Sequence, residues 1–111
     1  MRNLKKPATS KRTRPPRRVD YTRDFLSDWK RLSHSGRFDM KRLKAVMLLL
    51  IADDAPLGPE RKDHPLKGIW ANHRECHVGG DFLLIYQVDD SPGPGGFINF
   101  VRVGTHAELF Q

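Results

Sequence analysis

Cysteine is almost absent from the sequence, which contains Cys76 and no other. A chain with a single cysteine has no internal disulfide framework, and the N-terminus lacks the apolar core of a secretory signal. No run approaches the roughly 18 apolar residues that a membrane-spanning helix requires. From these absences we expect a soluble protein of the reducing cytoplasm.

Acidic residues are missing from the first 18 positions, which hold eight of the twenty lysines and arginines. The rest of the chain carries twelve basic and thirteen acidic residues, so the net charge of +7 belongs mostly to this N-terminal stretch. Such a stretch, with three prolines and few apolar residues, cannot bury enough surface to fold. We expect residues 1–18 to form a basic disordered tail, which either adds nonspecific attraction to RNA or has no role. Residues 19–111 are expected to form one domain.

Two helices are predicted in the first half of this domain. Thr22 can cap the first helix, which stops near Gly36, and Asp39 can cap the second, which spans about residues 40–52. The apolar positions recur at helical spacing, so they should pack against the rest of the domain. These positions are Phe25, Leu26, Trp29 and Leu32 in the first helix and Met40, Leu43, Val46, Met47 and Leu50 in the second.

Strand patterns dominate the second half of the chain. A loop rich in proline and glycine over 53–68 is followed by three β-rich segments, with a tight hairpin predicted at Gly79-Gly80. The predicted strands are 19–22, before the first helix, and then 70–78, 82–88 and 97–103. The predicted strand 82–88 is apolar almost throughout, which indicates a strand covered on both faces. A terminal helical turn beginning at Thr105 completes an α+β fold, in which two N-terminal helices pack on a small, mostly antiparallel sheet.

Polar side chains lie at the ends of these predicted strands, where functional sites are usually built. His64 lies in the loop before the sheet, His77 ends one strand, Asp81 begins the next, and His106 opens the terminal turn. Imidazole exchanges protons near neutral pH, and the guanidinium of Arg102 can stabilise charge on an attacked phosphate. The set predicts RNA cleavage by attack of a 2′-hydroxyl on the neighbouring phosphate. It leaves open which histidine is the base and which is the acid.

A metal site is not predicted from the same residues. His64, His77, Asp81 and His106 lack compact metal-ligand spacing, and Cys76 and His77 are strand neighbours that point to opposite faces. We therefore expect cleavage without a metal and without another cofactor.

Two groups of residues are candidates for RNA binding. Phe82 and Phe110 could either stack on bases or pack in the core. Arg37, Lys41 and Lys44 are predicted to share one flank of the second helix, as either an RNA-backbone contact or a solvated face.

Four ordered blocks resemble the YafQ branch of the RelE superfamily of bacterial toxins over about residues 20–111. They are Asp-His-Pro-Leu-Lys-Gly (63–68), Arg-Glu-Cys-His (74–77), Asp-Phe-Leu-Leu-Ile-Tyr (81–86) and Arg-x-Gly-Thr-His-Ala-Glu-Leu-Phe (102–110). The resemblance implies a microbial-ribonuclease-like fold and a ribosome-dependent mRNA endoribonuclease that a cognate antitoxin inhibits. It places the family's functional positions on His64, His77, Asp81, Arg102, His106 and Phe110.

The sequence departs from the usual pattern of that branch at three places. Phe82 stands where the branch usually has tryptophan, the segment 89–96 looks longer than the usual hairpin, and the basic tail is an addition. Two other functions fit the same residues: a non-catalytic toxin that binds a protein such as a topoisomerase, and a non-catalytic RNA-binding module.

Overall fold

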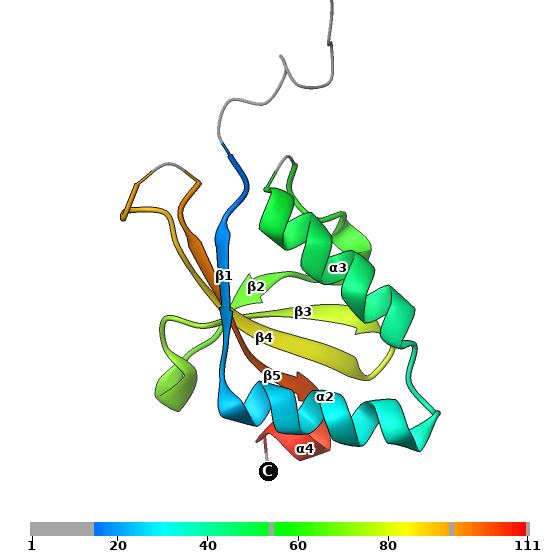
Figure 1. Cartoon of the computed structure of the whole chain (residues 1–111). Helices are drawn as coiled ribbons and strands as arrows, with labels where there is room; N and C mark the ends of the chain where they lie inside the picture. Colours follow the sequence, from blue (N-terminus) through cyan, green and yellow to red (C-terminus); the bar gives the residue numbers. More distant parts are fainter. Residues whose placement is uncertain (1–14, 54, 94, 111) are drawn as a thin grey trace, which may run out of the picture.

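A five-stranded sheet forms the centre of the domain in a computed structural model that describes residues 15–53, 55–93 and 95–110. The strand order is β1-β5-β4-β3-β2, with β1 parallel to β5 and the other neighbours antiparallel (Figure 1). The strands are β1 (Arg18–Tyr21), β2 (His64–Pro65), β3 (Arg74–Gly79), β4 (Phe82–Asp89) and β5 (Phe97–Gly104). The predicted α+β class and mostly antiparallel sheet are confirmed. The short strand β2 was not predicted.

Two helices pack against one face of this sheet. Helix α2 (Arg23–Ser35) begins where the Thr22 hydroxyl accepts a hydrogen bond from the amide of Phe25, and it ends at Gly36, whose φ of 71° is left-handed. Helix α3 (Met40–Ala52) begins where the Asp39 carboxylate accepts from the amide of Arg42. The predicted caps and bounds of both helices are therefore confirmed.

Two details of the helix prediction are wrong. Arg37 is not on α3, because the chain leaves α2 at Gly36 and becomes helical again only after Asp39. It lies instead in the short connection between the two helices. Leu26 is 48% exposed, because it falls outside the stripe that places Phe25 and Leu32 in the core.

The two faces of β4 enter two different apolar clusters. Leu84 and Tyr86 pack with the helices, whereas Leu83 and Ile85 face the other side of the sheet, where Leu109 covers them. Side chains alternate along a strand, so a strand covered on both faces needs apolar residues at nearly every position. The prediction that β4 is buried on both faces is confirmed.

The loop over 53–68 is more structured than predicted. It contains a turn of 3-10 helix, η1 (Pro59–Arg61), and the strand β2. A second turn, η2 (Gly68–Trp70), follows, so β3 begins at Arg74 and not at residue 70. Trp70 therefore lies between β2 and β3, where it packs on the apolar side that Leu83 and Ile85 share.

The N-terminal boundary of the domain lies slightly before the predicted one. The amide of Arg17 donates to the Ile51 carbonyl, and its guanidinium forms ion pairs with Asp53 and Asp90 at 3.3 and 3.1 Å. Arg17 and the first residue of β1 therefore belong to the fold, although both were assigned to the predicted tail. Residues 1–14 of that tail lie outside the described residues.

A short helix, α4 (His106–Phe110), closes the chain. The amide of Thr105 donates to the Glu108 carboxylate, and the amide of Glu108 donates to the Thr105 hydroxyl, which confirms the predicted capping box. Glu108 also pairs with Arg31 of α2 at 2.7 Å. In the described part of the chain, no helix has the length and apolar character needed to cross a membrane.

A buried carboxylate ties α2 to β5. Asp28 is only 5% exposed, and it accepts hydrogen bonds from the Arg102 guanidinium at 2.7 and 3.1 Å and from the amide of Val103 at 3.1 Å. A third donor is Arg31, at 3.2 Å. A charge taken out of water is tolerated only when paired in this way.

Replacing Asp28 by alanine should destabilise the domain by about 3 kcal/mol, because Arg102 loses its ion pair and the Val103 amide stays buried without an acceptor. Urea unfolding of Asp28→Ala measures the change. The control, Asp24→Ala on the same helix, removes an exposed carboxylate and should change stability by roughly 0.5 kcal/mol or less. Equal losses for the two variants would contradict the structural role of Asp28.

The single thiol should be unreactive in the folded protein. Cys76 is fully buried, and burial raises the pKa of its thiol to about 12, so almost no thiolate forms at mildly alkaline pH. Alkylation by iodoacetamide should therefore be about 100-fold slower, or more, in buffer than in denaturant. Mass spectrometry of timed samples measures both rates, and similar rates would show that the strand is open to solvent.

Candidate functional site

Two of the candidate histidines flank one carboxylate at the edge of the sheet. In the β2–β3 pairing, His64 lies opposite Glu75, and His77 follows Glu75 by two positions on the same face of β3. The Nε2 atoms of His64 and His77 lie 3.6 and 3.7 Å from the same Glu75 oxygen, Oε1. Glu75 is 5% exposed, whereas the side chains of His64 and His77 are 48% and 27% exposed. The structure thus brings His64 and His77 together around a buried acid.

Backbone carbonyls orient both of these imidazoles. His64 Nδ1 donates to the carbonyl of Lys62 at 2.6 Å, and His77 Nδ1 donates to the carbonyl of Gly80 at 3.3 Å. A carbonyl only accepts, so Nδ1 carries the hydrogen in each ring, and Nε2 is the nitrogen that can exchange a proton. Both reactive nitrogens therefore face the Glu75 carboxylate.

The loop that carries His64 is fixed to the sheet next to that histidine. Asp63 accepts hydrogen bonds from the Tyr86 hydroxyl and from the Arg74 guanidinium, the latter through two contacts of 3.3 Å. Burial, together with the hydrogen bond to Asp63, raises the pKa of Tyr86 well above its usual range, so the hydroxyl remains a donor. Arg61 adds a contact of 2.7 Å to the Val78 carbonyl. The position of His64 is therefore set by the contacts of two residues just before it, Arg61 and Asp63.

The β3–β4 hairpin connects His77 with His106. The carbonyl of Gly80 accepts from His77, and the carboxylate of the next residue, Asp81, accepts from the backbone amide of His106 at 2.9 Å. Asp81 therefore anchors the start of α4. The His106 ring lies against Phe110, with ring centroids 4.9 Å apart. Phe110, a candidate for base stacking, is partly buried among the residues on that side of the sheet.

The side chain of Arg102 is hydrogen-bonded to helix α2 rather than to the two paired histidines. In register it lies opposite Ile85, which in turn lies opposite Glu75, so the three occupy one row across β5, β4 and β3. Its Nε and Nη2 atoms are hydrogen-bonded to Asp28 of α2, and this pairing raises the pKa of the guanidinium. Nη1 lies outside the pair of contacts to Asp28. Arg102 thus occupies the row of Glu75, while its side chain is fixed by a helix.

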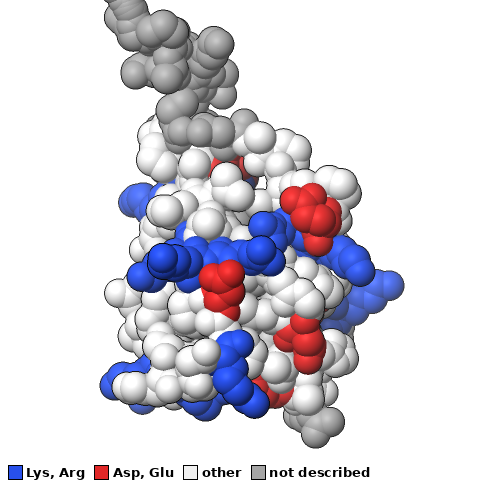
Figure 2. All heavy atoms as spheres, turned by 90° about the vertical axis from the view of Figure 1, so that its right-hand side faces the viewer, with Lys and Arg blue, Asp and Glu red and all other residues white. Residues whose placement is uncertain are grey.

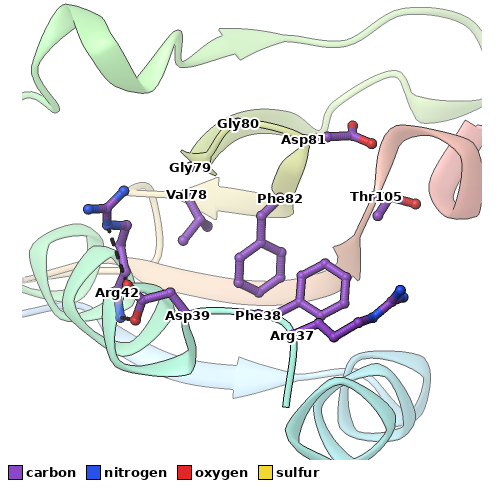
Figure 3. Close-up of a pocket in the computed structure, with 10 residues that line it drawn as sticks. All are labelled: Arg37, Phe38, Asp39, Arg42, Val78, Gly79, Gly80, Asp81, Phe82 and Thr105. Carbon is purple, nitrogen blue, oxygen red and sulfur yellow. Dashed lines mark hydrogen bonds and ion pairs between the residues drawn. The ribbon is translucent and has the colours of Figure 1, made fainter. Parts of the chain in front are cut away.

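The other candidate RNA-binding residues have varied surroundings. Phe82 is 5% exposed, and its ring lies 5.0 Å from that of Phe38, so it serves the core here and has little surface for a base (Figure 3). Arg37 lies over the Phe38 ring at 5.7 Å. Lys44 of α3 lies over the Trp29 ring at 5.8 Å, and Lys41 is exposed on the same helix.

Sequence reasoning missed two acids in this region. Glu75 was predictable from strand periodicity, since it lies two residues before His77 and must share its face. Asp28 interrupts the buried stripe of α2 between Phe25 and Leu32, and an acid in such a position indicates a buried partner. Within the described residues, no group of three or more His, Cys, Asp or Glu side chains is arranged to hold a metal ion.

Comparisons with known proteins identify the family of this chain. A family model described as a bacterial toxin of a type II toxin-antitoxin system, YafQ, matches residues 17–111. The mRNA interferase toxin YafQ of Escherichia coli strain K12 is 40% identical over 94 residues, which cover 85% of this chain and 96% of that protein.

Solved structures give the same result. In the crystal structure of the E. coli DinJ-YafQ complex, a chain with 40% identity matches 86% of this chain and 99% of its own length, with a TM-score of 0.74. A metal-bound toxin from Helicobacter pylori matches with 41% identity, 84% and 98% coverage and a TM-score of 0.72. This chain therefore belongs to the YafQ family of bacterial toxins of type II toxin-antitoxin systems.

Proposed function

We propose that this chain is an mRNA interferase, an endoribonuclease toxin that inhibits translation by cutting mRNA on the ribosome. The observation that carries the proposal is the pair of imidazoles, His64 and His77, that present Nε2 around Glu75. The related E. coli toxin is named an mRNA interferase. The place of action would be the cytoplasm, where mRNA is translated.

The proposed chemistry uses the 2′-hydroxyl of the RNA as the nucleophile. One imidazole removes the proton of this hydroxyl as its oxygen bonds to phosphorus, and a second gives a proton to the departing 5′-oxygen. His64, His77 and His106 share these two roles. The products are a 2′,3′-cyclic phosphate and a 5′-hydroxyl.

The remaining candidates support these steps. Asp81 orients the start of α4, and with it His106, through the hydrogen bond to the His106 amide. Arg102 stabilises the negative charge on the phosphoryl oxygens, and Asp28 fixes the plane of its guanidinium. Glu75 is a positioning residue, because its carboxylate can accept the hydrogen bond of whichever imidazole carries the extra proton.

A cognate antitoxin is the proposed protein partner. The E. coli relative has been crystallised as a DinJ-YafQ complex, and the family is one of toxin-antitoxin systems. The ribosome and mRNA are the proposed partners in cleavage.

A translation extract programmed with a reporter mRNA tests the function. The wild-type chain should cut the message during translation and leave 2′,3′-cyclic phosphate ends, and 1,10-phenanthroline, which removes transition metals and leaves Mg²⁺, should not stop it. Uncut mRNA would contradict the proposal. Cleavage that the chelator abolishes would contradict its metal independence, a relevant outcome because the H. pylori relative was solved with a metal bound.

Replacing His77 by alanine should reduce the cleavage rate by about 100-fold or more, since proton transfer by a placed group contributes about 10² to 10⁴ in rate. The rate is measured from the appearance of cut reporter mRNA. His34→Ala, which removes an exposed histidine of α2, is the control and should cut at the wild-type rate. A folded His77→Ala variant with undiminished cleavage would remove this residue from the mechanism.

Replacing Glu75 by glutamine should slow cleavage by about 10-fold, because the amide retains the shape of the side chain but carries no charge beside a protonated imidazole. The matched control is Glu60→Gln, an exposed glutamate in η1 on the same loop as His64. Equal rates for Glu75→Gln and wild type would limit Glu75 to a structural role.

A further inference from the structure

A pocket of about 370 Å³ opens beside the β3–β4 hairpin, on the side of the sheet that α3 covers (Figure 3). Phe38, from the connection between α2 and α3, and Phe82, at the start of β4, form an aromatic wall. Arg37 and Arg42 lie at opposite sides of this aromatic pair in Figure 3. The pocket is of the size that takes a small ligand or one residue of a polymer.

The two arginines that line the pocket are exposed, and its two aspartates accept hydrogen bonds from the backbone. Asp39 caps α3, and Asp81 accepts the amide hydrogen bond of His106. The guanidinium of Arg42 lies along the hairpin, since Nη1 would be 3.0 Å from a side-chain carbon added at Gly79. The guanidinium of Arg37 lies over the half-buried ring of Phe38 and extends its flat surface. Arg42 Nε also lies 3.8 Å from the Asp39 carboxylate, an exposed pair that a phosphate can replace. The lining therefore offers a stacking surface and two guanidinium groups, on Arg37 and Arg42.

This combination matches a nucleotide. Aromatic rings and arginine stack on bases of any sequence, and guanidinium groups bind phosphate. Because Phe82 is almost fully buried, the ring that can meet a base is Phe38. On the face seen in Figure 2, Lys and Arg form a band that acidic residues interrupt.

The pocket shares two residues with the hairpin that holds the histidines. Gly80 and Asp81 line the pocket, and the same two residues accept the hydrogen bonds of His77 and His106. The pocket and these histidines therefore contact the same hairpin, so a strand of RNA bound at the histidines would need only to continue past the hairpin to enter the pocket. We propose that the pocket is a nucleotide subsite, in which Phe38 and Arg37 stack on the base of a nucleotide near the cut and Arg42 binds its phosphate; this assignment rests on the proposed RNA cleavage.

Binding of an uncleavable RNA tests the subsite separately from catalysis. The probe is a fluorescent single-stranded RNA oligonucleotide with 2′-O-methyl groups throughout, which lacks the nucleophile. Phe38→Leu keeps an apolar side chain against the core but cannot stack, and it should bind about 10-fold more weakly in fluorescence anisotropy. The matched control, Phe97→Leu at the start of β5, should bind like wild type.

Arg37→Gln is a second variant at an exposed position, so its folding is not at risk. It should bind the probe about 3-fold more weakly and with a smaller dependence on salt, because one phosphate or base contact is lost. Arg23→Gln, an exposed arginine of α2, is its control and should leave the affinity unchanged.

The outcomes separate the subsite from the proposed function. Weaker binding by both variants supports the subsite, even if the wild type cuts no mRNA. Wild-type affinity in both variants overturns the subsite, even if the wild type cuts mRNA normally, and so does a wild type that binds no probe. The subsite is also overturned if the variants lose affinity for the antitoxin while they keep affinity for RNA, because the pocket would then be a protein contact.

Discussion

The central strand β4 is the constraint on which the rest of the structure depends, because it divides its side chains between two layers. Tyr86 points to the helix side and holds Asp63, the neighbour of His64, whereas Ile85 points to the other side, in the row that contains Glu75 and Arg102. One strand thus fixes both the loop before the site and the surface on which the site lies. Its first residue, Phe82, also forms the wall of the neighbouring pocket.

The local signals in the sequence were sufficient for most of the architecture. Caps at Thr22 and Asp39, the left-handed Gly36 and the capping box at Thr105 depend on residues within one turn of each other, so the sequence predicted them correctly. The short strand β2 was missed because its two residues pair with β3 and carry no pattern of their own. Leu26 was wrongly placed in the core because composition alone does not tell which side of a stripe meets the sheet.

The sequence indicated candidate histidines but not the contacts that they make in the fold. His64 and His77 are 13 positions apart, and only the β2–β3 register brings both to Glu75. The ion pair between Asp28 and Arg102 joins residues 74 positions apart, so no local pattern indicates it. The same holds for Phe38, which becomes part of a pocket only because the hairpin folds over the connection between the helices. Long-range pairing decides these features.

The parallel pairing of β1 with β5 also affects the order in which a growing chain can fold. β1 is among the first segments of the domain to leave the ribosome, but its only strand partner in the described sheet is the last strand to be made. The ion pair of Asp28 likewise cannot form until Arg102 has been made. Helices and the β3–β4 hairpin can form earlier, since their contacts are local. The sheet can therefore close along β1 only after β5 has been made, so the ordering of β1 is a late step in folding.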